Sequence, residues 1–205
     1  MKVITCNGSP RNNGVIQTSL EIMCAELKNE GIETEIIQVG KEAIPGCIDC
    51  RKCRELGKCV FNDDLVNSTA EKIRAADGLI IGSPVYYGSI AGNCKCFLDR
   101  LFFSGLMLNF KPVSAVVSCR RSGGINAFHQ MNNYFTLSRA LIVPSLYWSI
   151  VHGSNSTQAR EDKEGLQIAR TSAACMAWLI KALAYARKEM PLPELPERVR
   201  TNFIR

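Results

Sequence analysis

The chain has 205 residues, of which 46% are hydrophobic and 21% are charged, with a formal net charge of +6 and a pI near 8.8. This length accommodates one sizeable α/β domain and is short for two. No apolar run reaches the roughly eighteen residues that a membrane-spanning helix needs, and no basic segment is interleaved with aromatic residues, so we expect neither a membrane nor a nucleic acid as a partner. The positive charge favours phosphate-bearing ligands or acidic electron carriers, although a solvated basic surface explains it equally well.

The N-terminus and the cysteines indicate the cellular compartment of the protein and the chemistry of one segment. Residues 1–4 look like the start of a strand rather than a charged region followed by an apolar stretch, so we expect no signal peptide and a cytoplasmic location. The chain has 10 cysteines, and several of them crowd into one short segment. A chain that can build an ordinary core does not need a disulfide framework, so metal or redox chemistry is the better interpretation of that segment.

Apolar runs alternate with helical patterns along the chain. In chain order we expect a strand over 3–6, a helix with its apolar face at 16–27, a strand over 32–39, a cysteine-rich loop over about 41–62, a helix from Asp63 or Asp64 to about Ala76, a strand over 78–82, a loop over 83–92, a helix over 94–103, a strand over 112–118, a helix over 126–139, a short fifth strand beginning at 141–143 and a long helix over about 156–188. This β-α alternation predicts an α/β fold with a doubly wound parallel sheet covered by helices on both faces. We assign residues 1–190 to this domain and 191–205 to a C-terminal tail, whose prolines prevent a helix and which we expect to lie along the surface or a partner subunit.

Three loops leave strand ends of this sheet, where open parallel sheets bind their ligands. The first runs from Asn7 to Gly14 and leads into the first helix. Backbone N–H groups at the helix start, the hydroxyl groups of Ser9 and Thr18, and the planar guanidinium of Arg11 together suit an anion. The Gly-Lys-Ser/Thr ending of a Walker A loop is missing, and a plain polar turn is the alternative interpretation.

The second loop, over 82–92, combines aromatic residues with glycines. A flat redox ring needs an apolar or aromatic wall and backbone donors at its edge. Pro84, Val85, Tyr86 and Tyr87 supply such a wall, and the glycines let the main chain approach closely. Ordinary packing of the two tyrosines is the alternative interpretation.

The third loop, over 118–124, joins a flexible backbone to two cations, Arg120 and Arg121. This combination suits the pyrimidine edge of a flavin or the phosphate of a pyridine nucleotide, although a solvated basic turn also explains Arg121. We expect Cys119 to be a buried small residue rather than a nucleophile, because no histidine is near it in sequence. No set of nucleophile, base and carboxylate is readable, so we expect no catalytic side chain.

The chain resembles the NADPH-dependent FMN reductase branch of the flavodoxin-like superfamily. The resemblance rests on Gly8-Ser9-Pro10-Arg11 with Gly14 and Thr18, and on Ser83-Pro84-Val85-Tyr86-Tyr87-Gly88, and it extends to about residue 185. It implies a flavodoxin-like, three-layer α/β/α fold with a five-stranded sheet of order 2-1-3-4-5, FMN as cofactor, and a homodimer or homotetramer. In such a protein Ser9, Arg11 and Thr18 hold the FMN phosphate, and residues 84–88 line the isoalloxazine. The full set of expected cofactor-binding residues is Ser9, Arg11, Gly14, Thr18, Pro84, Val85, Tyr86, Tyr87, Gly88, Ser118, Arg120 and Gly123.

The crowded cysteines are Cys47, Cys50, Cys53 and Cys59, in the pattern C-x₂-C-x₂-C-x₅-C. Close spacing lets several thiolates converge on one centre, and successive x₂ steps suit the corners of a cubane cluster. A structural zinc site usually has two separated cysteine pairs and fits less well. The segment resembles that of iron–sulfur flavoproteins, a subgroup of the same superfamily, which implies a [4Fe–4S] cluster beside the FMN. Residues 57–64 also resemble FMN reductases in which no cluster is evident, so reduced thiols packed over the flavin are the alternative.

The motifs leave several functions open. We expect an FMN-dependent oxidoreductase that uses NAD(P)H to reduce a flavin, a quinone or another small acceptor, with the nicotinamide stacked beside Tyr86 and Tyr87. The first alternative is an iron–sulfur flavoprotein that passes electrons between FMN, a [4Fe–4S] cluster and a ferredoxin-like carrier, with reduced ferredoxin as donor. A flavin-binding redox sensor without turnover and a phosphate-ligand binder without flavin belong to other classes.

Overall fold

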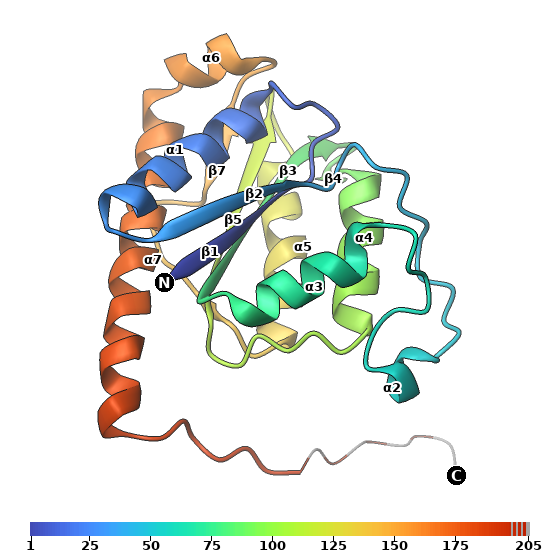
Figure 1. Ribbon diagram of the computed structural model, residues 1–205. Coiled ribbons are helices and arrows are strands. Elements are labelled where there is room, and N and C mark those ends of the chain that lie inside the picture. The colour runs from blue at the N-terminus through green and yellow to red at the C-terminus, as the bar shows by residue number, and fades with distance from the viewer. Residues whose placement is uncertain (198, 200, 202, 204–205) are drawn as a thin grey trace.

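The centre of the molecule is a parallel sheet, seen in a computed structural model that describes residues 1–197, 199, 201 and 203. Its strands are β1 (Lys2–Asn7), β2 (Glu33–Gln38), β3 (Gly78–Tyr86), β5 (Pro112–Cys119) and β6 (Leu141–Ile142), in the order β2-β1-β3-β5-β6 (Figure 1). Two short strands extend it: β4 (Ser89–Ile90) pairs antiparallel with β3, and β7 (Ile150–His152) pairs parallel with β5. When β4 is left out of the count, the order is the predicted 2-1-3-4-5, so the flavodoxin-like, doubly wound fold is confirmed.

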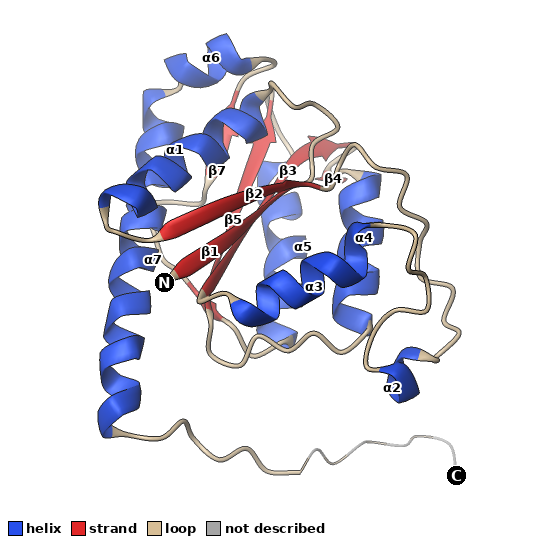
Figure 2. Cartoon of the chain, viewed as in Figure 1, coloured by secondary structure: helices blue, strands red, loops and turns tan. Residues whose placement is uncertain are grey.

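Helices cover both faces of the sheet, as predicted. The helices of the described residues are α1 (Val15–Asn29), α2 (Cys53–Leu56), α3 (Leu65–Ala75), α4 (Gly92–Phe103), α5 (Gly124–Leu137), α6 (Ser156–Glu161) and α7 (Lys163–Glu189), of which α2 lies in a loop away from the sheet. Figure 2 shows α1 and α7 on one face and α3, α4 and α5 on the other.

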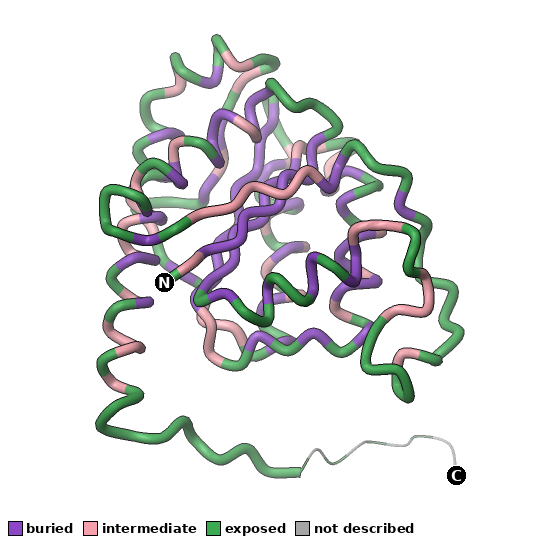
Figure 3. Tube along the Cα trace, viewed as in Figure 1, coloured by how far each residue is buried: buried purple, intermediate pink, exposed green. Residues whose placement is uncertain are grey.

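The side chains of the central strands enter two separate cores. In β3, Leu79 and Ile81 pack with α3, α4 and α5, whereas Ile80 packs with α1 and α7. This division follows because successive side chains of a strand point to opposite faces of the sheet. The run is continuously apolar because both faces are covered. The edge strand β2 is only partly buried, as Figure 3 shows.

The predicted fifth strand is split into two pieces. β6 pairs with the start of β5, β7 pairs with its end, and the chain bows out between them. Pro144 follows the last hydrogen bond of the first piece, which runs from the Val143 N–H to the carbonyl of Val113 over 2.9 Å. Since proline has no N–H to continue a ladder, the strand leaves the sheet there and returns six residues later.

The long helix expected over 156–188 is two helices, so that expectation is wrong. Asp162 separates α6 from α7, and its side chain caps α7 by accepting a hydrogen bond from the Gly165 N–H over 3.0 Å. The same carboxylate accepts a second bond from the His152 N–H over 2.6 Å. Aspartate is a preferred N-cap residue, and here the cap also attaches the start of α7 to the end of β7.

The loop expected over 83–92 is partly strand. β3 continues to Tyr86 and turns back into β4 through Tyr87 and Gly88, whose φ angles are 50° and 73°. Two successive positive φ angles are typical of a two-residue hairpin turn, for which glycine is well suited. The aromatic segment is therefore a hairpin at the end of the central strand.

The cysteine-rich segment over 41–62 is mostly loop, as expected, but it contains the single-turn helix α2. Gly57 ends that helix in a left-handed conformation with φ 66°. Of the two aspartates proposed to start the next helix, Asp64 is the cap, because its side chain accepts from the Val66 N–H over 3.0 Å.

The C-terminal residues 191–197 form no helix or strand and are exposed. The predicted tail over 191–205 also includes positions 198, 200, 202, 204 and 205, which lie outside the described residues, and the division into domain and tail stays a prediction. Within the described part of the chain, no helix is both long and apolar enough to cross a membrane.

Candidate functional site

A recess of about 210 Å³ lies beyond the carboxyl ends of β1, β3, β5 and β7. The recess is lined by Ser9, Arg11, Gly14, Val15, Ile16, Pro84, Val85, Tyr86, Ser118, Cys119, Arg120, Gly153 and Ser154. The structure thus brings residues of all three predicted loops together, and it adds a fourth loop that follows β7.

The first loop presents an anion-binding turn to this recess. The Asn7 side chain accepts from the Ser9 N–H over 2.9 Å, and the Ser9 hydroxyl accepts from the Arg11 N–H over 3.1 Å. α1 then begins after Gly14 without a hydrogen-bonding side-chain cap among the described residues and without an acidic residue in its first turn. Free N–H groups at a helix start bind phosphate groups well.

Arg11 also ties the first loop to the fourth. Its Nη1 donates to the carbonyl oxygen of Ser154 over 2.9 Å. Gly153 and Ser154 were missed by the sequence analysis, which placed the start of a short fifth strand at 141–143 and no strand at 150–152. The apolar pair Ile150-Val151, followed two residues later by Gly153, is the sequence signal that could have located this strand end.

Thr18 does not line the recess. It is the fourth residue of α1, and only 2% of its surface is exposed. Its predicted bond to a phosphate therefore stays a prediction, whereas Ser9 and Arg11 do face the recess.

The aromatic hairpin forms one wall of the recess. Tyr86 lines it, but Tyr87 at the turn is fully exposed and does not line it. α5 holds the hairpin in place, because Asn126 donates to the carbonyl of Gly88 over 2.5 Å and the Gln130 side chain accepts from the Ser89 hydroxyl over 2.8 Å. The position of this wall is thus set by the helix after β5.

Gly88 and Gly123, both predicted to bind cofactor, join two loops instead of lining the recess. Gly123 has φ 89°, and a Cβ placed on it would lie 3.1 Å from both the Cα of Gly88 and Cγ1 of Val85. Only glycine allows the third loop to approach the hairpin this closely in a left-handed conformation. The pair therefore fixes the spacing of the second and third loops.

The third loop contributes Ser118 and the exposed Arg120 to the recess, as predicted, together with Cys119. Burial raises the pKa of the Cys119 thiol, and backbone hydrogen bonds from Gly124 and Arg121 only partly oppose it. The thiol is therefore protonated at neutral pH, which agrees with the expectation that it is not a nucleophile.

The four cysteines of the motif line a second recess, beside the last turn of α4. Its lining residues are Cys47, Ile48, Cys50, Arg51, Cys53, Cys59, Val60, Phe61, Arg100, Phe103 and Ser104. Asp49 and Arg51 on either side of Cys50 have positive φ angles of 49° and 59°, so tight turns direct this stretch toward the recess. Most of the remaining wall is apolar.

The four cysteines of the motif share one recess. Among the described residues, however, no three His, Cys, Asp or Glu side chains lie close enough together to hold one metal ion. In a zinc site the sulfurs lie about 2.3 Å from one point, whereas in a cubane cluster they bind irons at separate corners.

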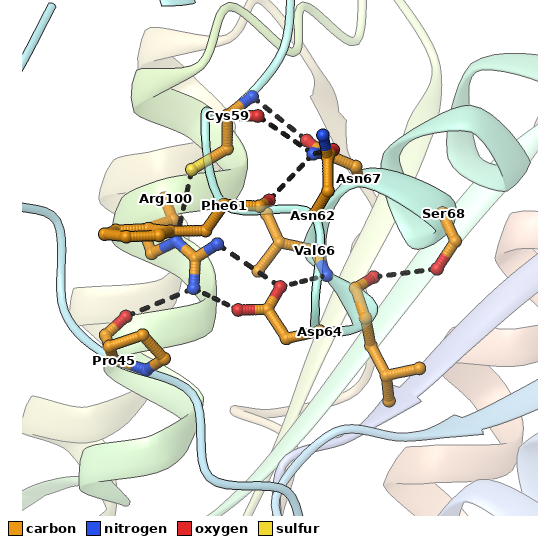
Figure 4. A network of polar contacts seen from close by, with 10 residues as sticks. Pro45, Cys59, Phe61, Asn62, Asp64, Val66, Asn67, Ser68 and Arg100 are labelled. Atoms are coloured by element: carbon orange, nitrogen blue, oxygen red, sulfur yellow. Dashed lines mark hydrogen bonds and ion pairs between the residues drawn. The ribbon is translucent and has the colours of Figure 1, made fainter.

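Polar contacts fix Cys59 more firmly than its neighbours (Figure 4). The Asn67 side chain accepts from the Cys59 N–H over 3.0 Å and donates to its carbonyl over 2.9 Å. Arg100 donates Nε–H to the Cys59 sulfur over 3.3 Å and forms an ion pair with Asp64. Burial lowers the pKa of Arg100, but the bonds to Asp64 and Cys59 outweigh it, so the group stays charged.

Sequence analysis missed Arg100 and Asn67. The signal for Arg100 is its position on α4, where it follows Phe97 by three residues and shares the buried face of that helix with Leu101. A charged residue on an apolar helix face needs a buried partner, but the sequence does not reveal which partner.

Comparison with known proteins places the chain among flavoproteins. The family NADPH-dependent FMN reductase matches residues 1–155. An iron–sulfur flavoprotein of Methanocaldococcus jannaschii is 33% identical over 192 residues, covering 89% of this chain and 99% of that protein. Among solved structures, RosB with a bound riboflavin-phosphate intermediate has a TM-score of 0.71 at 18% identity, covering 100% of this chain and 94% of that one. The flavoenzyme FerB of Paracoccus denitrificans, an NAD(P)H:(acceptor) oxidoreductase, has a TM-score of 0.62 at 15% identity, covering 88% and 97%.

The family match and the long relative agree with the geometry of the strand-end recess. The two structural neighbours support the flavodoxin-like fold. The chain therefore belongs to the NADPH-dependent FMN reductase family, in which iron–sulfur flavoproteins are its relatives over nearly the whole length, and it is an FMN-dependent oxidoreductase.

Proposed function

We propose that this protein transfers electrons between FMN in the strand-end recess and a [4Fe–4S] cluster held by Cys47, Cys50, Cys53 and Cys59. The observation that carries the proposal is the second recess, which all four cysteines of the motif line together. The kinship with iron–sulfur flavoproteins supports it. When bound, FMN exchanges one or two electrons and the cluster exchanges one at a time.

In the proposed FMN site, the phosphate lies at the start of α1. Ser9, Arg11 and the N–H groups after Gly14 bind it, and Thr18 supports the same helix turn. The opening of the recess between Arg11 and Arg120 provides positive charge for this anion. These groups bind and orient the cofactor, and none of them needs to move a proton.

The flat ring in this proposal lies against the hairpin. Pro84, Val85 and Tyr86 give an apolar wall, and Tyr87 and Gly88 form the rim of the same turn. Ser118, Arg120 and Gly123 supply or position donors at the ring edge. Because α5 holds the hairpin through Asn126 and Gln130, the wall is in place before the cofactor binds.

In the proposed cluster site, Ile48, Val60, Phe61 and Phe103 give the recess an apolar wall. Because this wall donates no hydrogen bonds to the sulfurs, the polar contacts that do reach a sulfur have more influence on the site. The Cys53 thiol donates to the carbonyl of Phe103 over 3.6 Å, a contact that holds its side chain at the recess.

The electron donor and acceptor are part of the proposal. The basic net charge supports an acidic carrier such as reduced ferredoxin as donor. NAD(P)H is the second candidate donor, favoured by the exposed Arg120 at the recess and by the exposed Arg121 that follows it, which suit a pyridine-nucleotide phosphate. A small molecule or a protein then accepts the electrons.

We also propose a cytoplasmic homodimer or homotetramer. The exposed apolar side chains of Leu146, Tyr147 and Trp148 lie together on the segment that bows out between β6 and β7, and such a patch supports an interface between subunits. Reduced thiols are maintained in the cytoplasm, and all ten cysteines are unpaired.

The test is anaerobic purification of the wild type, Cys50→Ser and the matched control Cys175→Ser, followed by a visible spectrum and assays of FMN, iron, sulfide and zinc. We expect flavin bands with a broad added shoulder and about four irons and four sulfides per chain in the wild type. Cys175 lies on α7, outside the recess, so its variant retains the iron that Cys50→Ser loses. Flavin bands without iron would reject the cluster and leave the NAD(P)H-dependent reductase.

Turnover separates the enzyme from a redox sensor. We expect anaerobic addition of reduced ferredoxin, NADH or NADPH to bleach the flavin bands, and an acceptor to restore them. Failure of all three donors to bleach a fully loaded protein would contradict electron transfer by this protein.

A further inference from the structure

The cysteine recess contains a buried cation. Arg100 lies in the last turn of α4, and only 1% of its surface is exposed. A buried charge is costly unless it is paired and its donors are satisfied, so the contacts of this side chain define its role.

The guanidinium of Arg100 donates on one edge to Asp64 and Pro45 and on the other edge to Cys59. Its Nη1 and Nη2 both contact the Asp64 carboxylate, the second over 3.2 Å, and Nη1 also donates to the carbonyl of Pro45 over 3.3 Å. The remaining nitrogen, Nε, donates to the Cys59 sulfur over 3.3 Å. The ring of Phe61 covers the face of the group, with its centroid 4.9 Å away. Asp64 thus fixes the plane of the guanidinium so that Nε is directed at one sulfur.

Asp64 is itself immobilised. One of its oxygens accepts from the Val66 N–H as the N-cap of α3, and only 7% of its side chain is exposed. A lysine at position 100 could not replace the arginine, because an ammonium group cannot hold a carboxylate on one edge and donate to a sulfur on the other.

Cys59 is the anchored member of the cysteine set. Asn67 binds both its N–H and its carbonyl, and also donates to the carbonyl of Phe61 over 2.9 Å. By contrast, Cys47 and Cys50 lie on an exposed loop. The sulfur of Cys59 and the nitrogen that faces it are therefore held by the same two helices, α3 and α4 (Figure 4).

We propose that Arg100 is a positioning residue that holds Cys59 as one corner of the cluster and, through the Nε–H···Sγ bond, raises the reduction potential of that cluster. This inference rests on the proposed function. Reduction adds one electron and forms or breaks no bond, and the added charge spreads onto the sulfurs. A donor at a sulfur stabilises the reduced state more than the oxidised state, so its removal lowers the potential.

Removing the negative charge of Asp64 is expected to shift the reduction potential of the cluster in the opposite direction. Asp64→Asn removes the negative charge but retains a good N-cap residue and leaves Arg100 facing Cys59. The cation is then no longer neutralised, so the potential of the cluster rises. A purely structural ion pair would change stability, and loss of Arg100 would then shift the potential no more than the loss of another nearby positive charge does.

The experiment measures the cluster potential of the anaerobically purified full-length protein by titration with dithionite as electron donor, followed by electron paramagnetic resonance. We compare wild type, Arg100→Gln, Arg100→Lys, Asp64→Asn and the control Lys58→Gln. Lys58 is exposed, lies next to Cys59 in sequence and does not line the recess, so its variant removes a charge without removing the bond. Iron and sulfide are assayed in every sample.

We expect lower potentials in both Arg100 variants, a higher potential in Asp64→Asn, and a shift in Lys58→Gln smaller than that in Arg100→Gln. Wild-type potentials in loaded Arg100 variants, or equal shifts in Arg100→Gln and Lys58→Gln, would overturn the proposal. If the Arg100 variants do not fold, the sign of the Asp64→Asn shift decides, and an unchanged or lower potential rejects it. Wild-type protein that lacks iron and sulfide refutes the proposed function instead, and the role of Arg100 is rejected with it.

Discussion

Substitution of Gly123 tests how the recess is built. In Gly123→Ala, an alanine must adopt φ 89°, and its Cβ lies 3.1 Å from the Cα of Gly88. A left-handed conformation costs a non-glycine residue about 1–2 kcal/mol. The backbone at Gly88 must in addition give way by a few tenths of an ångström, which moves the hairpin that forms one wall of the proposed FMN site.

A matched control separates these two effects. Gly31 has φ 76°, but a Cβ placed on it meets nothing within 4 Å. Both variants therefore lose about 1–2 kcal/mol of unfolding free energy, measured in urea, from the conformational cost. Only Gly123→Ala weakens FMN binding, by about tenfold in Kd or ~1.4 kcal/mol, measured by quenching of flavin fluorescence on titration into FMN-free protein. Equal FMN affinity in the two variants would refute the idea that Gly123 sets the position of the wall.

Two further predictions concern charge. Arg11→Ala removes the cation and the bond to Ser154. We expect the Kd for FMN to rise about 10–100-fold, as loss of a charged hydrogen bond implies, while the affinity for riboflavin, which lacks the phosphate, changes little. Equal losses of affinity for both ligands would place the phosphate elsewhere. Bonds from Lys2 and Lys72 hold the pKa of Glu35 below its ordinary value of 4.5. Because the folded-state pKa is lowered, this stabilisation is present above the unfolded-state pKa and is lost as the pH falls through the folded-state pKa. Glu35→Gln therefore removes at most about 1 kcal/mol of unfolding free energy at pH 7 and less at pH 3. An equal loss at both pH values in urea titrations would contradict this prediction.

The strand order and the grouping of three loops could be predicted from the sequence because local patterns carry them. Continuous apolar runs mark strands that are covered on both faces, and loops after such strands meet at one sheet edge. The predictions for Ser9, Arg11, Tyr86 and Arg120 placed them near this edge, and the structure brings them to one recess.

Errors arose where a single residue overrode a longer pattern. Pro144 interrupts the fifth strand because it cannot donate a ladder hydrogen bond, and Asp162 interrupts a helical pattern because its side chain caps the next helix. Both positions are visible in the sequence, but whether a chain bows out there depends on the neighbouring strand β5 and on the end of β7.

The contacts around Cys59 could not be predicted for a different reason. Arg100 and Asp64 are 36 residues apart, and Arg100 and Cys59 are 41 apart. Only the packing of α3 beside α4 brings these groups together, and spacing within either helix carries no information about it. The cysteine pattern alone therefore indicated the ligands but not the residues that hold them.

The most direct test of the account is an anomalous-difference map at the iron edge from crystals of anaerobically purified protein. We predict a compact iron peak in the recess bounded by Cys47, Cys50, Cys53 and Cys59, and FMN density in the strand-end recess with its phosphate at Ser9. Free thiols around an iron-free recess, a single metal ion there, or flavin bound at another face of the sheet would contradict it.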